Sequence, residues 1–340
     1  MLDQPMLDQI VSPAAAVGFP GLIFAYRFRD GQAEALPAGG LLAALQEPGG
    51  WIWIHLALTE THARDWIAHH APLPERARAI LLSDDEHQLL EPIANGVAGV
   101  FADLLREGEG EARDLGRLRF ALTDTLVVSG RRDALGAIER TLQAIDAGRR
   151  FPDAVALLEA IVEHFVDATA ALAQQLADTL DLIEDHLIDD AMRDEQRRLG
   201  PVPRTAVRLH RQLASLRVLF HRWAHPTAAE LPSRIGVAAG RLAQRLDGLD
   251  QEVVALQERA RLLQEEITAK LAAETNRHLF ALSLATVFLL PPTLAAGIFG
   301  MNVSDLPFTK EAGGFFWAIA LCVASSVAVY DFLRWLRIMR

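Results

Sequence analysis

The sequence is almost without cysteine and is short of basic side chains, and both facts exclude classes of protein. Cys322 is the only cysteine among 340 residues, which excludes an internal disulfide framework and thiolate-rich zinc sites. Lys and Arg number 33 against 44 Asp and Glu, a formal net charge of −11. A general nucleic-acid binder needs a basic surface, so we expect no nucleic-acid partner. Any bound metal must be held by oxygen or nitrogen.

Motifs of common enzyme active sites are also missing. The sequence contains no glycine-rich phosphate loop, no His-Glu-x-x-His pair and no nucleophile elbow. We therefore expect neither an enzyme nor a resident cofactor.

Charge is missing as well from two long apolar runs near the C-terminus. Residues 279–300 are 22 in a row without a charged side chain, and residues 312–330 are 19 more. Each run can cross about 30 Å of hydrocarbon as a helix, which predicts a membrane protein with two spans. The flanking basic residues are Lys270, Arg277, Arg334, Arg337 and Arg340. The positive-inside rule then places both termini, and the first 278 or so residues, in the cytoplasm.

The cytoplasmic part divides into two regions by its patterns. Residues 1–150 mix strand-like and helical runs, which predicts an α+β domain. Its expected strands are 22–28, 51–56, 97–105, 117–122 and 126–129, and its expected helices are 60–70, 74–82 and 135–147. Asn95-Gly96 is typical of a tight turn before the third strand.

Residues 151–278 have only helical patterns. We expect an acidic helix over 152–199, a break at 200–203, and a basic helix over 204–225 that packs antiparallel to the acidic one. A long stalk helix should follow Pro232 and continue into the first span. Its heptad seam is Leu242, Leu246, Leu249, Val253, Leu256, Ala260, Leu263 and Ile267. This seam must meet other helices of the same chain or copies of itself.

Polar residues recur on one face of the first span. Asn276, Ser283, Thr286, Thr293 and Asn302 share this face with Leu279, Leu290 and Gly297, because steps of three and four keep residues on one side of a helix. Polar groups in hydrocarbon should face protein or water. The stripe therefore lines a pore, or its hydroxyls bond back to the helix and its small residues aid helix packing.

The triplet Gly300-Met301-Asn302 ends the first span. At this place in a chain of this organisation, it resembles the signature of the CorA superfamily of divalent-cation transporters. The segments 119–128, 282–291 and 312–315 look most like the ZntB branch of zinc transporters within it. Ser304 and Asp305 depart from the two glycines usual in that branch, and the acidic Met-Pro-Glu-Leu type of loop seen in magnesium-type members is absent. The transported ion thus stays open.

The resemblance implies a funnel-shaped homopentamer in the inner membrane of a bacterium, with the first spans around an axial pore. Asn302 would form the outer ring. The other residues expected along the ion path are Gly300, Met301, Gly297, Thr293, Leu290, Thr286, Ser283, Leu282, Leu279 and Asn276. Zn²⁺ is the expected ion, with Mg²⁺, Co²⁺ or Ni²⁺ as alternatives, and the resemblance also suggests proton coupling.

Two further groups of acidic residues are candidates for cation contacts. Asp305 and Glu311 against Lys310 give each outer loop a net charge of −1, which concentrates cations at the mouth of an assembly unless the loop is simply solvated. His186 with Asp185 and Asp189 is a candidate regulatory metal site, against the alternative of a solvated acidic face.

Three functions follow from these patterns. The first is transport of divalent cations, with zinc as the expected ion, through the axial pore of a pentamer. The second is a CorA-type channel for Mg²⁺ or Co²⁺. The third, of another class, is a membrane-anchored metal sensor or scaffold in which the two spans serve only as an anchor.

Overall fold

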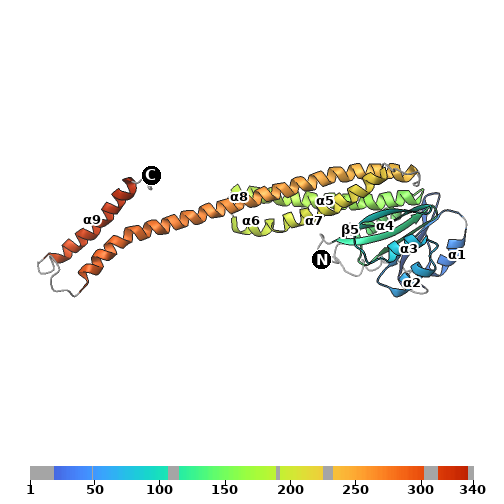
Figure 1. Cartoon of the computed structure of the whole chain (residues 1–340), viewed down its shortest axis with the longest axis horizontal. Coiled ribbons are helices and arrows are strands. Elements are labelled where there is room, and N and C mark those ends of the chain that lie inside the picture. The colour runs from blue at the N-terminus through green and yellow to red at the C-terminus, as the bar shows by residue number, and fades with distance from the viewer. Residues whose placement is uncertain are drawn as a thin grey trace. The chain divides into compact units, whose positions relative to one another are not determined.

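The computed structural model describes residues 19–47, 49–105, 115–188, 192–224, 233–301 and 313–335. The chain divides into two compact units, residues 1–263 and residues 264–340 (Figure 1). This division is made on contacts within the chain. The boundaries at 150 and 278 rest on changes of sequence pattern and stay predictions.

A seven-stranded sheet forms the N-terminal part of the first unit. Its order is β2-β1-β3-β7-β6-β5-β4, and only the β3–β7 pair is parallel. The strands are β1 (Leu22–Arg29), β2 (Gln32–Ala35), β3 (Trp51–Ala57), β4 (Leu89–Ile93), β5 (Gly96–Leu104), β6 (Leu115–Thr123) and β7 (Leu126–Arg131). All five expected strands are present, and the two edge strands, β2 and β4, are strands that the sequence analysis did not list. Asn95, with φ of 59°, makes the turn between β4 and β5 as predicted.

Helices cover both faces of this sheet. One core joins β3 residues Ile52 and Ile54 to the short helices α1 (Leu41–Gln46), α2 (Thr61–His69) and α3 (Glu75–Leu82). On β5, Ala98 and Val100 belong to this core. Asp103 has the opposite parity and instead contacts α4 (Gly136–Asp146), so α4 lies on the other face.

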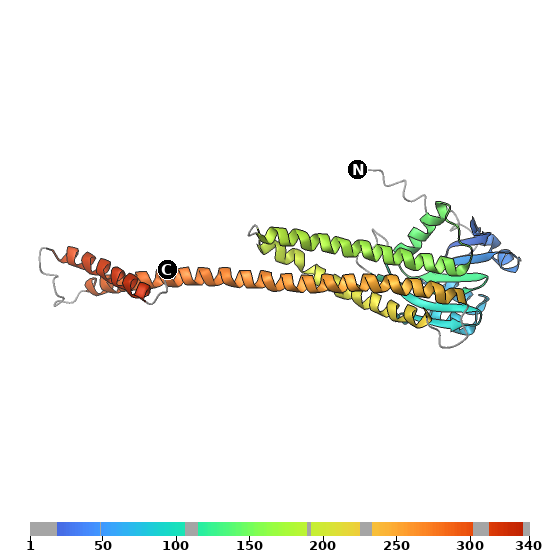
Figure 2. The same ribbon diagram turned by 90° about the horizontal axis from the view of Figure 1, so that it is seen from above.

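Four helices make up the rest of the first unit, of which one continues beyond it (Figure 2). They are α5 (Ala154–Ile188), α6 (Met192–Leu199), α7 (Pro201–Ala224) and α8 (Ser233–Phe299). The single helix expected over 152–199 is wrong, because α6 is a separate helix that packs back against α5. Like charges at a spacing of four, such as Asp185 and Asp189, disfavour a continuous helix at this point.

Ion pairs join α8 to both of its neighbours. Arg241 makes two hydrogen bonds of 2.7 Å to Glu159 of α5, and Arg259 pairs with Glu184 and Asp181 of the same helix. On the other side, Asp250 of α8 accepts from His210 of α7 at 2.7 Å. The sequence analysis pairs the acidic helix with the basic helix α7 and does not consider α8, whose arginines make these ion pairs with α5.

The predicted heptad seam of α8 is buried from Leu242 to Ile267, and its residues are at most 7% exposed. The apolar stripe of α5, which ends in Ile183 and Leu187, is buried as well. The seam was expected to pack against other helices of the same chain or against copies of itself. Over the part in the first unit, helices of the same chain cover it. The face of α8 that bears Leu262, which is 53% exposed, is left open.

Substitution of two leucines on α8 should separate these two faces. Leu246 is fully buried, so Leu246→Ala should destabilise the first unit by about 2–5 kcal/mol. Leu262→Ala is the matched control and should change the stability of the first unit by about 0.5 kcal/mol or less. Thermal unfolding of the purified full chain in detergent measures both. Equal losses of stability would contradict the assignment of the two faces.

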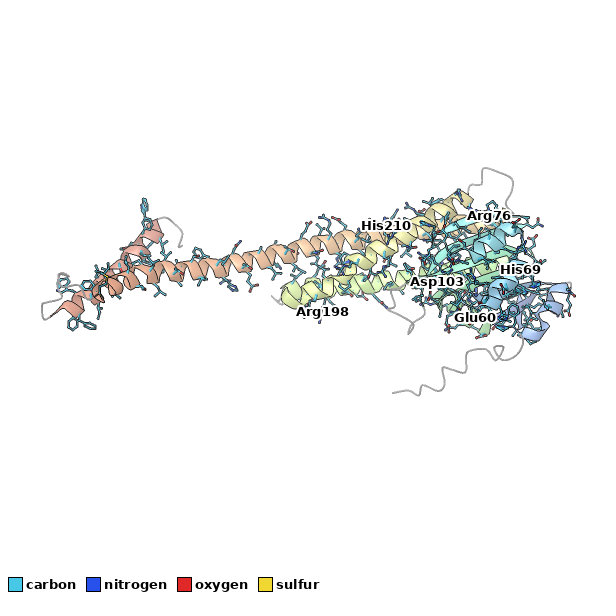
Figure 3. The ribbon with its side chains drawn as sticks, turned by 60° about the horizontal axis from the view of Figure 1, so that its bottom comes forward. Glu60, His69, Arg76, Asp103, Arg198 and His210 are labelled. Atoms are coloured by element: carbon cyan, nitrogen blue, oxygen red, sulfur yellow. The ribbon has the colours of Figure 1, made fainter. Side chains whose placement is uncertain are left out.

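Asp103, labelled in Figure 3, is a fully buried residue whose carboxyl group contacts the N-terminus of α4. Its Oδ2 accepts the backbone N–H of Ala137 at 2.9 Å. Burial raises its pKa from the ordinary 3.8 to about 7, although the backbone amides of Ala137 and Leu104 and the charge of Arg140 act in the opposite direction. The folded chain therefore holds this proton over a pH range in which the unfolded chain has released it.

This raised pKa predicts a stability that depends on pH. Stability should fall as the pH rises from about 4 to about 7, because the unfolded state then binds fewer protons than the folded state. Asp103→Asn keeps an acceptor for Ala137 and removes the charge. The Tm of the variant should exceed that of the wild type by at least about 2–4 °C at pH 8, and the two Tm values should be equal near pH 4. A difference in Tm that is the same at both pH values would contradict this account.

Candidate ion-conduction surface

The second unit contains the end of α8 and helix α9 (Gly314–Trp335). Both α8 and α9 contain a stretch long and apolar enough to cross a membrane, and only 6% of each stretch is buried. Large apolar side chains such as Leu282 and Phe316 are 66% and 75% exposed. Such surfaces are unstable in water and need lipid or other protein to cover them.

Helix α9 contacts one face of α8. Phe288 and Pro292 of α8 line a cavity together with Cys322, Val323 and Tyr330 of α9. The Cys322 Sγ lies 3.6 Å from the Pro292 carbonyl oxygen. This face of α8 therefore packs against α9, a helix of the same chain.

The predicted polar stripe lies on the other side of α8. Thr286, Leu290, Thr293 and Gly297 line an open groove of about 680 Å³ on the helix. At about 100° per residue, these four positions lie roughly 120–180° from the midline of Phe288 and Pro292. Neither helix of this unit covers the stripe, since all four residues are exposed.

The threonine hydroxyls bond back to their own helix. Thr286 donates to the carbonyl of Leu282 at 2.9 Å, and Thr293 donates to that of Leu289 at 2.6 Å. Such hydrogen bonds from a hydroxyl to its own helix are the alternative to a pore that the sequence analysis left open. It does not use up the hydroxyl oxygens, which keep lone pairs that can accept from water or contact a hydrated cation.

Two prolines within α8, Pro291 and Pro292, were not weighed in the sequence analysis. Each lacks a backbone N–H, so the carbonyls of Val287 and Phe288 lose their usual helical donors. The Pro-Pro pair was visible in the sequence as a local break in helical hydrogen bonding.

A repeat of seven residues runs along α8 from Gly248 into the stripe. Gly248, Ala255, Leu262, Ala269, Asn276, Ser283, Leu290 and Gly297 are spaced by seven, and all eight are exposed. Residues seven apart drift by about 20° per step on a helix, so neighbours in this repeat lie nearly in line while the whole row winds around the helix by about 140° from Gly248 to Gly297. The exposed face of α8 is thus a second seam, distinct from the buried one.

The remaining predicted residues are placed as follows. Leu279 and Leu282 are exposed on α8, Gly300 closes the helix through its N–H to the Ala296 carbonyl at 2.9 Å, and Met301 is 53% exposed. Asn302, Asp305, Glu311 and Asp189 lie outside the described residues. Within the described residues no group of three or more His, Cys, Asp or Glu side chains could hold a metal ion, and His186 contacts Glu195 instead.

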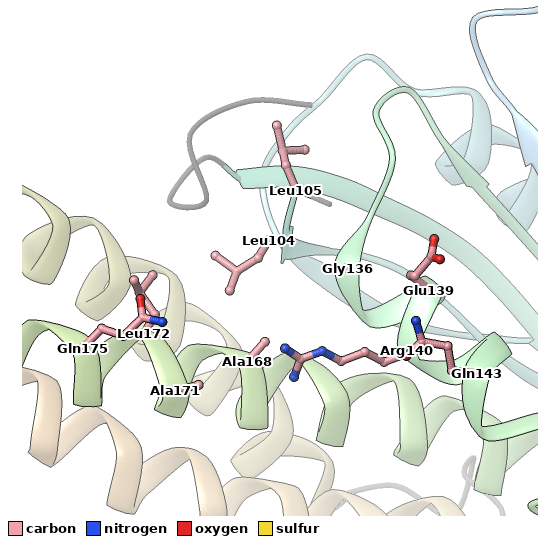
Figure 4. Close-up of a pocket in the computed structure, with 10 residues that line it drawn as sticks. All are labelled: Leu104, Leu105, Gly136, Glu139, Arg140, Gln143, Ala168, Ala171, Leu172 and Gln175. Carbon is pink, nitrogen blue, oxygen red and sulfur yellow. The ribbon is translucent and has the colours of Figure 1, made fainter. Parts of the chain in front are cut away.

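The first unit also contains a cavity. It has a volume of about 340 Å³ and lies between β5, α4 and α5, with Arg140 extended along α5 toward Ala168 (Figure 4). Its lining combines the Arg140 guanidinium, the Glu139 carboxylate, the amides of Gln143 and Gln175, and apolar groups.

The fold and the two exposed apolar helices define a membrane protein with a mixed α/β N-terminal domain and two C-terminal spans. Residues 48–334 match the family of CorA-like Mg²⁺ transporter proteins, so the chain belongs to the CorA family. It is a divalent-cation transporter and not an enzyme.

Curated relatives and solved structures agree with this assignment. The chain is 25% identical over 93% of its length to a zinc transport protein ZntB of Pectobacterium atrosepticum, of which it covers 95%. It is 25% identical, over 93% of its length and 97% of the relative, to the divalent cation transporter CmaX of Pseudomonas aeruginosa. The structure of a full-length CmaX protein matches with a TM-score of 0.79 at 23% identity, over 95% of this chain and 99% of that one. The CorA magnesium transporter of Methanocaldococcus jannaschii matches with a TM-score of 0.74 at 18% identity, over 92% and 96%.

Cysteine labelling should distinguish the two faces of α8 in the membrane. In a Cys322→Ser background, Thr293→Cys should react with a charged, water-soluble thiol reagent in liposomes, because a lined pore holds water. Ala295→Cys is the matched control, since Ala295 is only 8% exposed, and it should react at least about tenfold more slowly, because thiolates form and react where water reaches them. Equal rates at the two positions would contradict a water-filled path along the stripe.

Proposed function

We propose that five copies of this chain form a funnel-shaped homopentamer in the inner membrane of a bacterium, with both termini in the cytoplasm, and move Zn²⁺ through an axial pore. The stripe of Asn276, Leu279, Ser283, Thr286, Leu290, Thr293 and Gly297 lines this pore. The observation that carries the proposal is the position of the stripe on α8, turned away from α9 and left exposed by the chain itself.

Exposed polar residues on one side of a span need a reason. A lipid-facing helix gains nothing from Ser283, Thr286 and Thr293, whereas a helix around a pore offers their oxygens to water and hydrated ions. The exposed seven-residue repeat, in which Gly, Ala and Ser outnumber the larger residues, supports close packing of identical helices about an axis. A simple two-span anchor would need neither feature, which favours transport over a sensor or scaffold.

The residues along the stripe suggest how an ion would pass. A ring of Asn302 amide oxygens contacts the hydration shell of a divalent cation without stripping it. Rings of Leu279, Leu282 and Leu290 narrow the path and close it to water when they come together. Gly300 and Met301 link the ring to the span, and Asp305 and Glu311 attract cations to the outer mouth.

Zinc is the proposed substrate because the relatives of similar length include proteins named as zinc transporters. Mg²⁺, Co²⁺ and Ni²⁺ are the competing ions, since CmaX is named only as a divalent cation transporter. No charged side chain lies within residues 279–300, so any coupling to protons uses groups outside the first span.

Uptake by the purified protein in proteoliposomes tests the pore. Wild-type protein should take up Zn²⁺, and Asn302→Ala should lower the rate at least tenfold without altering the size of the assembly, because the ring that recruits the ion is lost. Ser325→Ala on α9 is the matched polar control and should transport normally; its hydroxyl donates only to the Cys322 carbonyl of its own helix.

Comparison of ions and gradients in the same assay decides between the alternatives. Zinc uptake that increases with an inward proton gradient supports a proton-coupled zinc transporter. Magnesium uptake indifferent to pH would make the protein a CorA-type magnesium channel. A correctly assembled Asn302→Ala protein with normal uptake would overturn the pore assignment, and the absence of flux of either ion in the wild type would favour the sensor.

A further inference from the structure

A buried carboxylate lies where α6 packs against α5. Glu195 of α6 has a side chain only 3% exposed, while its partner His186 near the end of α5 is 43% exposed. The His186 Nδ1 lies 2.9 Å from Glu195 Oε1, and Arg198 lies 3.7 Å from the same oxygen. Glu195 was one of many acidic residues in the sequence, and only the return of α6 onto α5 brings it to His186.

The second oxygen of this carboxylate has no partner. Glu195 Oε2 is fully buried and makes no hydrogen bond. A buried charged oxygen without a donor or a cation is costly, because it has lost its hydration without replacement. The two oxygens belong to one carboxyl group, so a cation bound at Oε1 would also offset part of the uncompensated charge on Oε2.

The distance between these donors suits a metal ion. Two ligands about 2.0–2.1 Å from the same Zn²⁺ lie about 2.8–3.4 Å apart for angles between 90° and the tetrahedral value. The observed separation of 2.9 Å lies within this range, and widening by about half an ångström would reach tetrahedral geometry. A cation can then take the place of the proton that His186 shares with Glu195.

We propose that His186 and Glu195 form a binding site for a zinc-class divalent cation, separate from the ion-conduction surface. An imidazole nitrogen with a carboxylate favours Zn²⁺, Co²⁺ or Ni²⁺ over Mg²⁺, which prefers an all-oxygen shell. Water completes the coordination. The site replaces the predicted set of His186, Asp185 and Asp189, of which Asp185 is exposed and Asp189 lies outside the described residues.

Binding of the cation would fasten α6 to α5. His186 belongs to one helix and Glu195 to the other, so a shared cation links the two segments more strongly than a single hydrogen bond does. The site would therefore report the zinc concentration on the side of the membrane where the first unit lies. This inference concerns binding and does not depend on the pentamer or on the pore.

Calorimetric titration of the purified full chain with Zn²⁺ in detergent tests the site. The variants are His186→Ala, Glu195→Gln and the double variant, with His62→Ala as the control, because His62 is an exposed histidine on α2. Each single variant should lose one zinc equivalent, or weaken it at least about tenfold, given that loss of even an outer-shell partner costs about 10–100-fold. The double variant should lose no more than either single one.

Two further measurements make the outcome decisive. Zinc should raise the Tm of the wild type and of Asn302→Ala alike, but this increase should shrink in His186→Ala and in Glu195→Gln. Millimolar Mg²⁺ should not displace the zinc equivalent. Wild-type stoichiometry and affinity in His186→Ala, an equal loss in His62→Ala, or displacement by Mg²⁺ would overturn the proposal. If uptake fails while this zinc equivalent still binds, the result would contradict the proposed pore and leave the His186–Glu195 site in place.

Discussion

Two seven-residue repeats on one helix are the constraint on which the rest of this structure depends. The seam through Leu246 and Val253 is buried within the chain, and the seam through Ala255 and Leu262 is exposed. A helix with apolar or small residues on two faces is satisfied only when both faces are covered. The fold covers the first, and the proposed assembly would cover the second with other copies of the chain.

Ion pairs between α8 and its two neighbours favour this arrangement of the helices. The arginines of α8 pair with carboxylates of α5, while its aspartates pair with basic side chains of α7, so each neighbour is matched to one side of α8. Most of these pairs are partly exposed and each contributes little to stability. Their effect is on which helix packs where, because a wrong pairing would place like charges together.

Much of the organisation was predictable because it depends on periodicity. Hydrophobic spacing predicted five of the seven strands, the stalk seam and the two spans, and the triplet beginning at Gly300 pointed to the family. The predictions that were wrong depended on long-range choices. A single helix over 152–199 was expected, and α8 was overlooked as the partner of the acidic helix, since local pattern does not say where a chain turns back or which surface receives a charged face.

The sequence by itself determined the class of this protein, because the length and apolarity of a span and the spacing of a helix face are local properties. Only the tertiary structure decided the environments of single polar groups. Asp103 is buried beneath the N-terminus of α4, and Glu195 contacts His186 where α6 packs back against α5. The burial and the hydrogen-bond partners of a side chain come from residues distant in sequence. They change its chemistry, but the local sequence around it does not show them.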